Sequence, residues 1–292
     1  MPDGDDQSWD DLFDDDGEID VDLAIGRLRE RWDDELAMEL LWEALCHQGT
    51  CIWETYALFP TLIEMATGPE NPEQRRELSA FLGYVVQVTF DRPSLPMGEL
   101  PEPVVTPRRE RAADEIAQVR QAFFRSLPEI RSICEQAFLE NLVYADEAQC
   151  WLLGVAAADG LISLARGLEN GETGWVECVH CDAHYGYSEI RELWGLYHRV
   201  VSSRGAIVIT SLEQEHRDWR DGAPNNANSV VQPDPEPADH DDSRIRALVA
   251  LARKSPTPRL LKRLKNLLGT FACSECGKTS PVVAIEPPIK AV

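Results

Sequence analysis

Two short cysteine pairs that lie far apart in the chain carry the clearest chemistry in this sequence of 292 residues. They are Cys178-Val-His-Cys181 and Cys273-Ser-Glu-Cys276. At this spacing a tight turn points both thiolates at one metal ion, and two such pairs complete a tetrahedral structural zinc site. Gly277 directly follows the second pair and suits a turn of that kind. We therefore expect Cys178, Cys181, Cys273 and Cys276 to hold one structural Zn²⁺ ion, with no coordination position open for a substrate.

Two other interpretations of these pairs stay open. Each pair could be a thioredoxin-type redox site, which requires a helix directly after the first cysteine, whereas the flanking residues here favour strands and loops. His180 and His184 could complete a local metal site with the first pair, although the cramped spacing favours surface or supporting positions for both imidazoles. The shared site in turn requires the two pairs to meet across the 91 residues from 182 to 272, which would form a large insertion.

The other four cysteines have simpler interpretations. Cys46, Cys134 and Cys150 lie on or near apolar helical stripes, so we expect them to be buried as small apolar residues. Cys51 comes at the start of a helix, where a thiolate could be stabilised. Its one possible catalytic partner nearby is His47, which we expect to pack or hydrogen-bond at the helix junction instead.

The charge of the chain is strongly acidic and unevenly spread. It has 28 basic and 51 acidic residues, a net charge of −23, which repels nucleic acid and anionic membranes and favours basic partners. Residues 1–20 contain nine Asp and one Glu and no basic residue, whereas residues 243–268 contain eight basic residues and no acidic one. We expect the acidic tail to be disordered, and one hypothesis is that it folds back onto the basic stretch.

The N-terminal residues are acidic and contain no apolar segment of the kind found in a signal peptide. No run approaches the roughly 18 apolar residues that a membrane helix needs. We therefore expect a cytoplasmic protein that makes no contact with membranes. In that compartment all eight cysteines would stay reduced.

Apolar residues at helical spacing predict a mainly α-helical body over residues 20–172. Residues 91–107 contain five prolines and no periodicity, which predicts a surface loop or linker before helices resume near Arg108. The individual helices that we expect are Asp20–Trp32 with Leu23 and Leu28 inward, Asp34–His47, one capped by Thr50 and kinked at Pro60, one opened by Asn71-Pro72, one opened by Ser126-Leu127-Pro128-Glu129, and the pair Asp146–Ala158 and Gly160–Leu168.

Two stretches of this body resemble a known kind of repeat. LLWEALCHQGTCIWETYALFPTLIEMA (40–66) looks like the HEAT-like helical repeats of many bacterial proteins, and DEAQCWLLGVAAADGLISLARGL (146–168) is similar to a second helix pair of that type. The resemblance implies an α-solenoid in which antiparallel helix pairs stack on one another. It also implies an immunity or interaction protein, of the kind found beside toxin genes.

Residues 173–292 differ in character from the helical body. Strand-forming residues flank both cysteine pairs and predict a strand, a tight turn and a second strand around each pair. We therefore expect a disordered acidic tail (1–19), a HEAT-like α-helical domain (20–172) and a small α+β zinc-ribbon-like module (173–292) with its insertion at 182–272. Within the insertion we expect a helix over Glu189–His198, a strand over 206–210, a flexible loop over 221–242 and a basic helical stretch over 243–268, interrupted by Pro256 and Pro258.

The sequence contains no phosphate-binding loop, dinucleotide fingerprint, zinc-protease motif or serine-hydrolase motif, so we do not expect an enzyme. We expect a protein-binding module, specifically a bacterial immunity-type protein of a toxin–antitoxin pair that neutralises a basic toxin such as a nuclease by direct binding. The alternative is a nucleic-acid-binding zinc-ribbon protein whose basic stretch 243–268 contacts phosphates.

Overall fold

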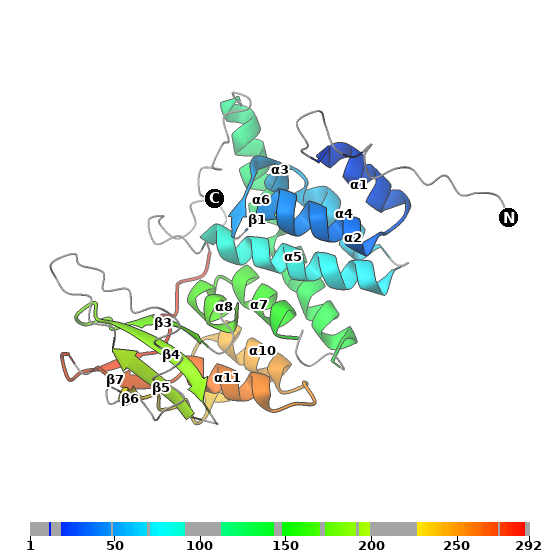
Figure 1. The fold of residues 1–292 in the computed structure, drawn as a ribbon. Coiled ribbons are helices and arrows are strands. Elements are labelled where there is room, and N and C mark those ends of the chain that lie inside the picture. The colour runs from blue at the N-terminus through cyan, green and yellow to red at the C-terminus, as the bar shows by residue number, and fades with distance from the viewer. Residues whose placement is uncertain are drawn as a thin grey trace. The chain divides into compact units, whose positions relative to one another are not determined.

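The structure is a computed structural model that describes Leu12 and residues 19–47, 49–68, 71–90, 112–142, 148–169, 173–190, 193–198, 227–273 and 275–289. These parts of the chain are mainly helical, as expected (Figure 1). They form two compact units, Met1–Ile162 with Pro288–Val292, and Ser163–Pro287. The predictions for most of the acidic tail, for the linker 91–107 and for a strand at 206–210 fall outside the described residues. Leu12 of the tail is buried, and its carbonyl accepts a hydrogen bond from the Asp20 N–H (2.8 Å).

The first unit consists of helices around the long helix α5, which packs against α4, α6 and α7. Figure 1 shows α5 running through the middle of this unit. None of the helices in the described ranges combines the length and the apolar character that a membrane span requires. The elements are α1 (Val21–Glu30), α2 (Asp34–Met38), the π-helix η2 (Glu39–Leu45), β1 (Cys46–His47), β2 (Thr50–Cys51), α3 (Trp53–Ala57), α4 (Phe59–Thr67), α5 (Pro72–Phe90), α6 (Ala113–Glu140) and α7 (Ala148–Ala158).

Local signals predict several helix starts correctly. Asn71 caps α5, because its side-chain oxygen accepts the N–H groups of Glu73 (2.9 Å) and Gln74 (3.3 Å). In α1 the prediction is half wrong: Leu28 is buried, but Leu23 is 49% exposed. The buried stripe of α1 runs through Ala24, Ile25 and Leu28 instead, and successive residues of a helix are about 100° apart, which turns Leu23 away from the core.

The helix expected over Asp34–His47 ends differently. It begins as α2, continues as the π-helix η2 and stops at Leu45, where the β1–β2 hairpin begins. Thr50 therefore lies in a strand and caps no helix, and the next helix begins after Ile52. That helix is broken rather than kinked, because α3 ends at Ala57 and α4 begins at Phe59.

Both prolines that we expected to shape helices act differently from the prediction. Pro60 lies in the first turn of α4, where its missing N–H leaves no helical hydrogen bond unmade. Pro128 lies inside α6, which continues through it, so the predicted capping box at Ser126 does not open a helix. Ser126 instead donates its hydroxyl to the Ala122 carbonyl (2.9 Å). Buried residues on both sides of Pro128, such as Phe124 and Ile130, keep the helix on the core.

Helices α5, α6 and α7 approach one another at three small residues. A Cβ atom added to Gly154 of α7 would lie 2.5 Å from the Cys134 Sγ of α6 and 3.0 Å from the Gly83 Cα of α5. Real Cβ atoms do not come this close to other heavy atoms, so either the helices or the cysteine would have to move. The glycines therefore set the spacing of the three helices.

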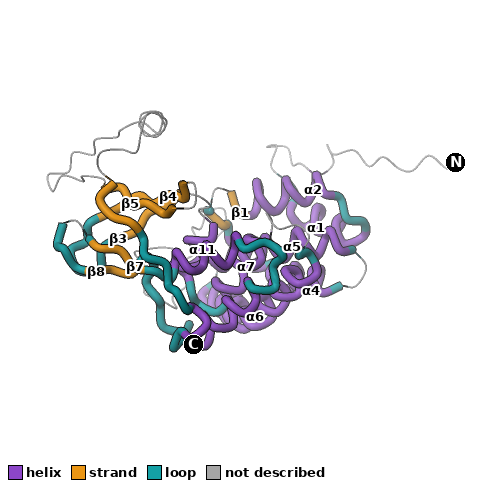
Figure 2. Tube along the Cα trace, turned by 90° about the horizontal axis from the view of Figure 1, so that it is seen from below, coloured by secondary structure: helices purple, strands orange, loops and turns teal. Residues whose placement is uncertain are grey.

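The second unit combines a sheet with helices. Strands β3 to β6 form one antiparallel sheet in that order, and β7 pairs with β8. Figure 2 shows these strands, in orange, gathered in one group. The elements are α8 (Ile162–Glu169), β3 (Thr173–Glu177), β4 (His184–Ile190), β5 (Leu193–His198), β6 (Ala227–Val230), the short 3₁₀-helix η3 (Pro237–Asp239), α10 (Ser243–Ala252), α11 (Arg259–Leu267), β7 (Thr270–Ala272) and β8 (Thr279–Pro281).

The insertion 182–272 contributes strands and helices to this unit. The predicted helix over Glu189–His198 is wrong, since these residues end β4 and form β5, with Tyr185 paired to His198. Leu193–His198 contains Gly195 and aromatic residues, which disfavour a helix and suit a sheet. The loop expected over 221–242 also contains β6. The two basic helices α10 and α11, separated around Pro256 and Pro258, are as predicted.

Replacing Gly154 by Ala should destabilise the first unit by about 1–3 kcal/mol, because the added methyl group overpacks the contact between α5, α6 and α7. Gly26→Ala is the matched control, since no atom lies within 4 Å of a Cβ at this exposed position of α1. The control should stabilise by about 0.5–1 kcal/mol. Urea unfolding of both variants measures the difference, and equal stability of Gly154→Ala and the wild type would contradict the close approach.

Candidate metal centre

Both cysteine pairs lie at the tips of antiparallel hairpins in the second unit. The first pair connects β3 to β4, which are in register from Thr173 opposite Ser188 to Glu177 opposite His184. The second pair connects β7 to β8. The strand, turn and strand predicted around each pair are therefore confirmed.

The two turns have the same backbone geometry. In each, the N–H of the first cysteine, Cys178 or Cys273, donates to the carbonyl five residues later over 2.9 Å. The fourth residue after it, Asp182 or Gly277, donates its own N–H back to that cysteine's carbonyl, also over 2.9 Å. Both of these residues have positive φ angles, 57° for Asp182 and 70° for Gly277. Glycine adopts this conformation without a steric penalty, and aspartate is among the residues that tolerate it.

The turns bring the four predicted cysteines together. All four Sγ atoms lie within 4.8 Å of one another. Cys178 Sγ is 3.7 Å from Cys276 Sγ, and Cys181 Sγ is 3.6 Å from Cys273 Sγ. A tetrahedral zinc ion with Zn–S bonds of about 2.3 Å separates its sulfur ligands by about 3.8 Å. The cluster can therefore hold a metal ion and fits Zn²⁺, and with four thiolates as ligands such an ion would have no position for a reactive water.

Tyr185 supports the cluster from the sheet. It is fully buried, its ring stacks edge-on against Phe271 at 5.2 Å, and its hydroxyl lies 3.0 Å from Cys273 Sγ. Burial of Cys273 opposes ionisation of its thiol. Hydrogen bonds from the Tyr185 hydroxyl and from the backbone N–H groups of Cys276 and Glu275 outweigh that effect and lower the pKa of Cys273 to about 6. These hydrogen bonds therefore favour the thiolate form of Cys273.

Cys181 has the opposite tendency. A hydrogen bond to the Ala183 backbone favours its thiolate, but loss of water and hydrogen bonds to the neighbouring cysteines raise the pKa of Cys181 to about 12. The shifts of Cys273 and Cys181 have opposite directions, as expected for sulfur atoms whose negative charges would repel at this distance. A divalent cation removes that conflict, because its charge favours all four thiolates together.

The histidine beside the first pair has a supporting position. His180 Nε2 donates to the Thr279 carbonyl (3.0 Å), and the Val179 N–H donates to Ser280 Oγ (3.2 Å). Both bonds join the first turn to β8. Among the described residues, the group that could hold a metal ion at this site consists of the four cysteines and does not include His180. The side chain of His184 lies outside the described residues.

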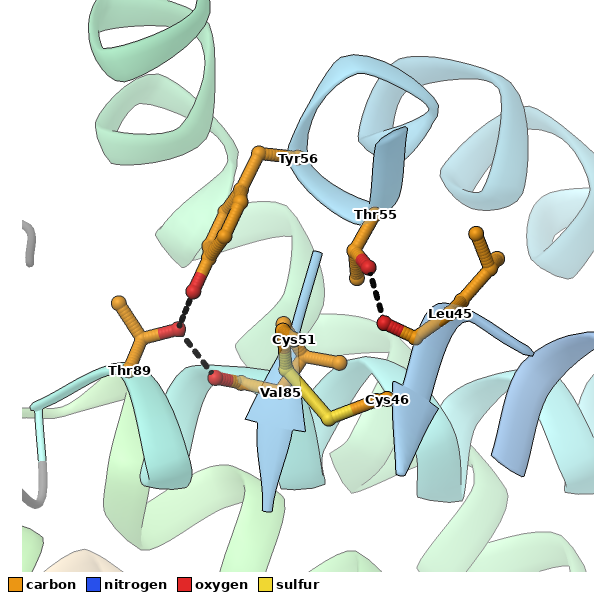
Figure 3. Close-up of a disulfide and its surroundings, with 7 residues drawn as sticks. All are labelled: Leu45, Cys46, Cys51, Thr55, Tyr56, Val85 and Thr89. Carbon is orange, nitrogen blue, oxygen red and sulfur yellow. Dashed lines mark hydrogen bonds between the residues drawn. A yellow bond between two sulfur atoms is a disulfide. The ribbon is translucent and has the colours of Figure 1, made fainter. Parts of the chain in front are cut away.

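The remaining cysteines divide three ways. Cys134 is buried as predicted, its Sγ donates to the Ser79 carbonyl (3.3 Å), and burial raises the pKa of its thiol to about 12. The prediction for Cys150 is wrong, because it is exposed beside the buried stripe of α7. Cys46 and Cys51 are joined by a disulfide (Figure 3), which contradicts the expectation that all eight cysteines stay reduced. The hairpin that pairs them places their side chains on directly opposed residues.

Comparison with known proteins does not assign this chain to a family. No protein-family model, curated protein or solved structure matches it. The resemblance to HEAT-like repeats therefore stays a prediction.

The purified protein should bind one Zn²⁺ ion per chain, and Cys273→Ser should abolish stoichiometric binding because it removes one of the four ligands of the shared site. Cys150→Ser is the matched control, since Cys150 is exposed on a helix of the first unit and should leave the zinc content unchanged. Elemental analysis of dialysed protein gives the stoichiometry. Two zinc ions per chain, or full zinc retention in Cys273→Ser, would contradict a single shared site.

Tyr185→Phe should weaken zinc binding by roughly 10–100-fold while the four ligands remain, because the hydrogen bond that stabilises the Cys273 thiolate is lost. Competition with a chromophoric chelator measures the affinity. Tyr56→Phe is the control for loss of a buried tyrosine hydroxyl, since Tyr56 bonds Thr89 in the first unit (3.0 Å). Equal zinc affinities in Tyr185→Phe and wild type would remove Tyr185 from the centre.

Proposed function

We propose that this chain is a non-enzymatic, protein-binding immunity-type protein that neutralises a basic toxin by direct contact. In this proposal the first unit is a HEAT-like α-solenoid that supplies the binding surface. The second unit is a zinc-ribbon-like module held by one structural Zn²⁺ ion. A metal with four thiolate ligands has no open position, so it supports the fold and does not take part in the binding.

The observation that carries the proposal is the charge of the first helices. Residues 19–68 contain ten acidic and three basic residues, a net charge of −7. Some of these acids have structural roles. Asp20 and Asp33 cap α1 and α2, and Glu64 pairs with Arg29 at 3.2 Å. Helix caps and exposed ion pairs of this kind explain only some of the ten acidic residues in this region.

Other acids in this region are exposed around an apolar side chain. Glu35 and Glu39 are exposed on α2 and η2, and Met38 between them is 52% exposed. Asp22 and Glu30 on α1 are exposed as well. An apolar contact surrounded by carboxylates suits a basic partner, because the charges steer the approach and the methionine supplies contact area.

The alternative function, nucleic-acid binding through residues 243–268, has fewer cations to use than its composition suggests. At least four of its eight basic residues bond within the second unit. Arg263 is 1% exposed and donates to the Gly167 carbonyl (3.2 Å), and Lys265 donates to Pro235 (3.1 Å). Arg244 pairs with Asp242 at 2.6 Å, and Arg246 donates to the carbonyls of residues 240 and 241. These contacts favour a structural use of the basic helices.

The proposal is tested with the product of the gene beside this one, expressed as a toxin. Co-expression of the chain should protect cells, and the two purified proteins should bind with an affinity that falls as salt rises. Glu35→Lys combined with Glu39→Lys should weaken binding at least 10-fold by placing positive charge against a basic surface. Isothermal titration at two salt concentrations measures the change.

Asp239→Lys combined with Asp241→Lys makes the same charge change on exposed residues of the second unit and serves as the control. It should leave the affinity within about twofold of wild type if the acids of α2 and η2 form the contact. Absence of both protection and a complex would refute the immunity function. Equal losses in the two double variants would show that net charge alone, rather than this surface, determines binding.

A further inference from the structure

The disulfide between Cys46 and Cys51 closes a short hairpin at the junction of two helices (Figure 3). The two cysteines are directly opposed in the β1–β2 pair, with Cα atoms 4.0 Å apart, and His47 pairs with Thr50 across the turn. Gly49 in the turn has a φ angle of 77°, which suits a two-residue hairpin loop. The pairing of the hairpin places the two cysteines where their sulfur atoms can bond.

This hairpin connects the π-helix η2 to α3. Leu45 is the last residue of η2. Its carbonyl accepts hydrogen bonds from the Ile52 N–H (3.1 Å) and from the Thr55 hydroxyl. One residue further on, Tyr56 bonds Thr89 of α5 (3.0 Å), whose hydroxyl in turn donates to the Val85 carbonyl (2.6 Å). The state of the disulfide can therefore affect how η2 and α3 are held against α5.

The rest of the chain argues against a permanently oxidised pair. The four-cysteine cluster can bind a metal ion only while Cys178, Cys181, Cys273 and Cys276 are thiolates. Cys181 of that cluster is exposed, so strongly oxidising conditions would reach it. One chain that contains both groups must therefore work where thiols persist, and in such conditions a disulfide forms and breaks according to the local thiol–disulfide ratio.

We propose that Cys46 and Cys51 form a reversible disulfide that switches the stability of the η2–α3 junction in response to a low-molecular-weight thiol–disulfide couple such as glutathione. In the reducing direction a thiolate attacks one sulfur of the protein disulfide and releases the other cysteine as a thiolate. A second thiol then resolves the mixed disulfide. The net reaction converts two small thiols and the protein disulfide into one small disulfide and two protein thiols, which balances atoms and electrons.

Access to the sulfur atoms controls how fast the switch operates. Cys46 and Cys51 are only 1% and 3% exposed, whereas His47 and Thr50 beside the turn are exposed. The hairpin must open locally before a small thiol can attack, which a pair of two-residue strands does more easily than the packed helices. His47 Nδ1 also lies 2.7 Å from a carboxylate oxygen of Glu43, so this edge of the hairpin is tied to η2 by an exposed contact.

A redox titration tests the proposal directly. The full-length, zinc-loaded chain is equilibrated from both directions in glutathione buffers of graded ratio, and free thiols are then alkylated in denaturant before trypsin digestion. The tryptic peptide 32–75 contains Cys46 and Cys51 as its only cysteines, and the peptide 132–166 contains Cys134 and Cys150 as an internal control. The first peptide should change from doubly alkylated to unalkylated as the oxidised fraction rises, while the buried Cys134 of the control peptide stays alkylated.

Two results of this titration would overturn the proposal. A peptide 32–75 that stays unalkylated in excess reduced glutathione would mean a permanent structural disulfide. One that stays doubly alkylated in excess oxidised glutathione would mean that no disulfide forms.

A second measurement tests the effect on the fold. Reduction should lower the melting temperature of the first unit by about 4–8 °C, as expected for opening a short disulfide loop in a unit of this size. It should also increase hydrogen exchange across residues 39–57 selectively. Cys46→Ser combined with Cys51→Ser should melt like the reduced wild type in every buffer, whereas Cys150→Ser should keep the redox-dependent shift. A shift of equal size in the double variant would place the redox effect elsewhere and refute the switch.

Discussion

The second unit depends on four sulfur atoms that meet from two turns 91 residues apart in the chain. Four thiolates within 4.8 Å of one another repel, so the metal-free cluster keeps protons that a dication would displace. The cost of closing a chain segment of this length is entropic and grows only slowly with its length. Coordination energy can therefore fix β3–β4 against β7–β8.

Helix α8 shows how the second unit uses charge inside its fold. The carboxylate of Glu286 accepts the N–H and the hydroxyl of Ser163 at the N-terminus of α8. At the other end the buried guanidinium of Arg263 donates to the Gly167 carbonyl in the last turn. An anion at the start and a cation at the end both favour the helix dipole. Arg263 belongs to α11 and Glu286 follows β8, so these contacts fasten α11 and the residues around Glu286 to α8.

The sequence predicts those features that a few neighbouring residues determine. The tight turn between Cys178 and Cys181 and the helix cap at Asn71 each depend on a few consecutive residues. Both are present in the structure as expected. Features that depend on distant partners are not predicted. Leu193–His198 is a strand because β4 and β6 flank it, and α6 continues through Pro128 because apolar residues on both sides are buried. The glycine at position 49, between Cys46 and Cys51, is typical of a hairpin loop. The apolar helical spacing before Cys46 predicted a helix through His47 instead, so the hairpin and its disulfide were not predicted.

The position of the basic residues sharpens what the net charge of −23 means for a partner. A count of residues treats every charge as available at the surface, yet Arg263 is buried and Arg244 is bonded to both Asp242 and the Glu286 carbonyl. Exposed carboxylates such as Glu35 and Glu39 have no such enclosure. Exposed charges contribute most to the electrostatic potential that an approaching partner meets, because they act across only a few ångströms of water. A charged side chain that already bonds within the protein contributes less. Within the described residues, the surface of the first helices is therefore one that a cation-rich partner would meet as acidic.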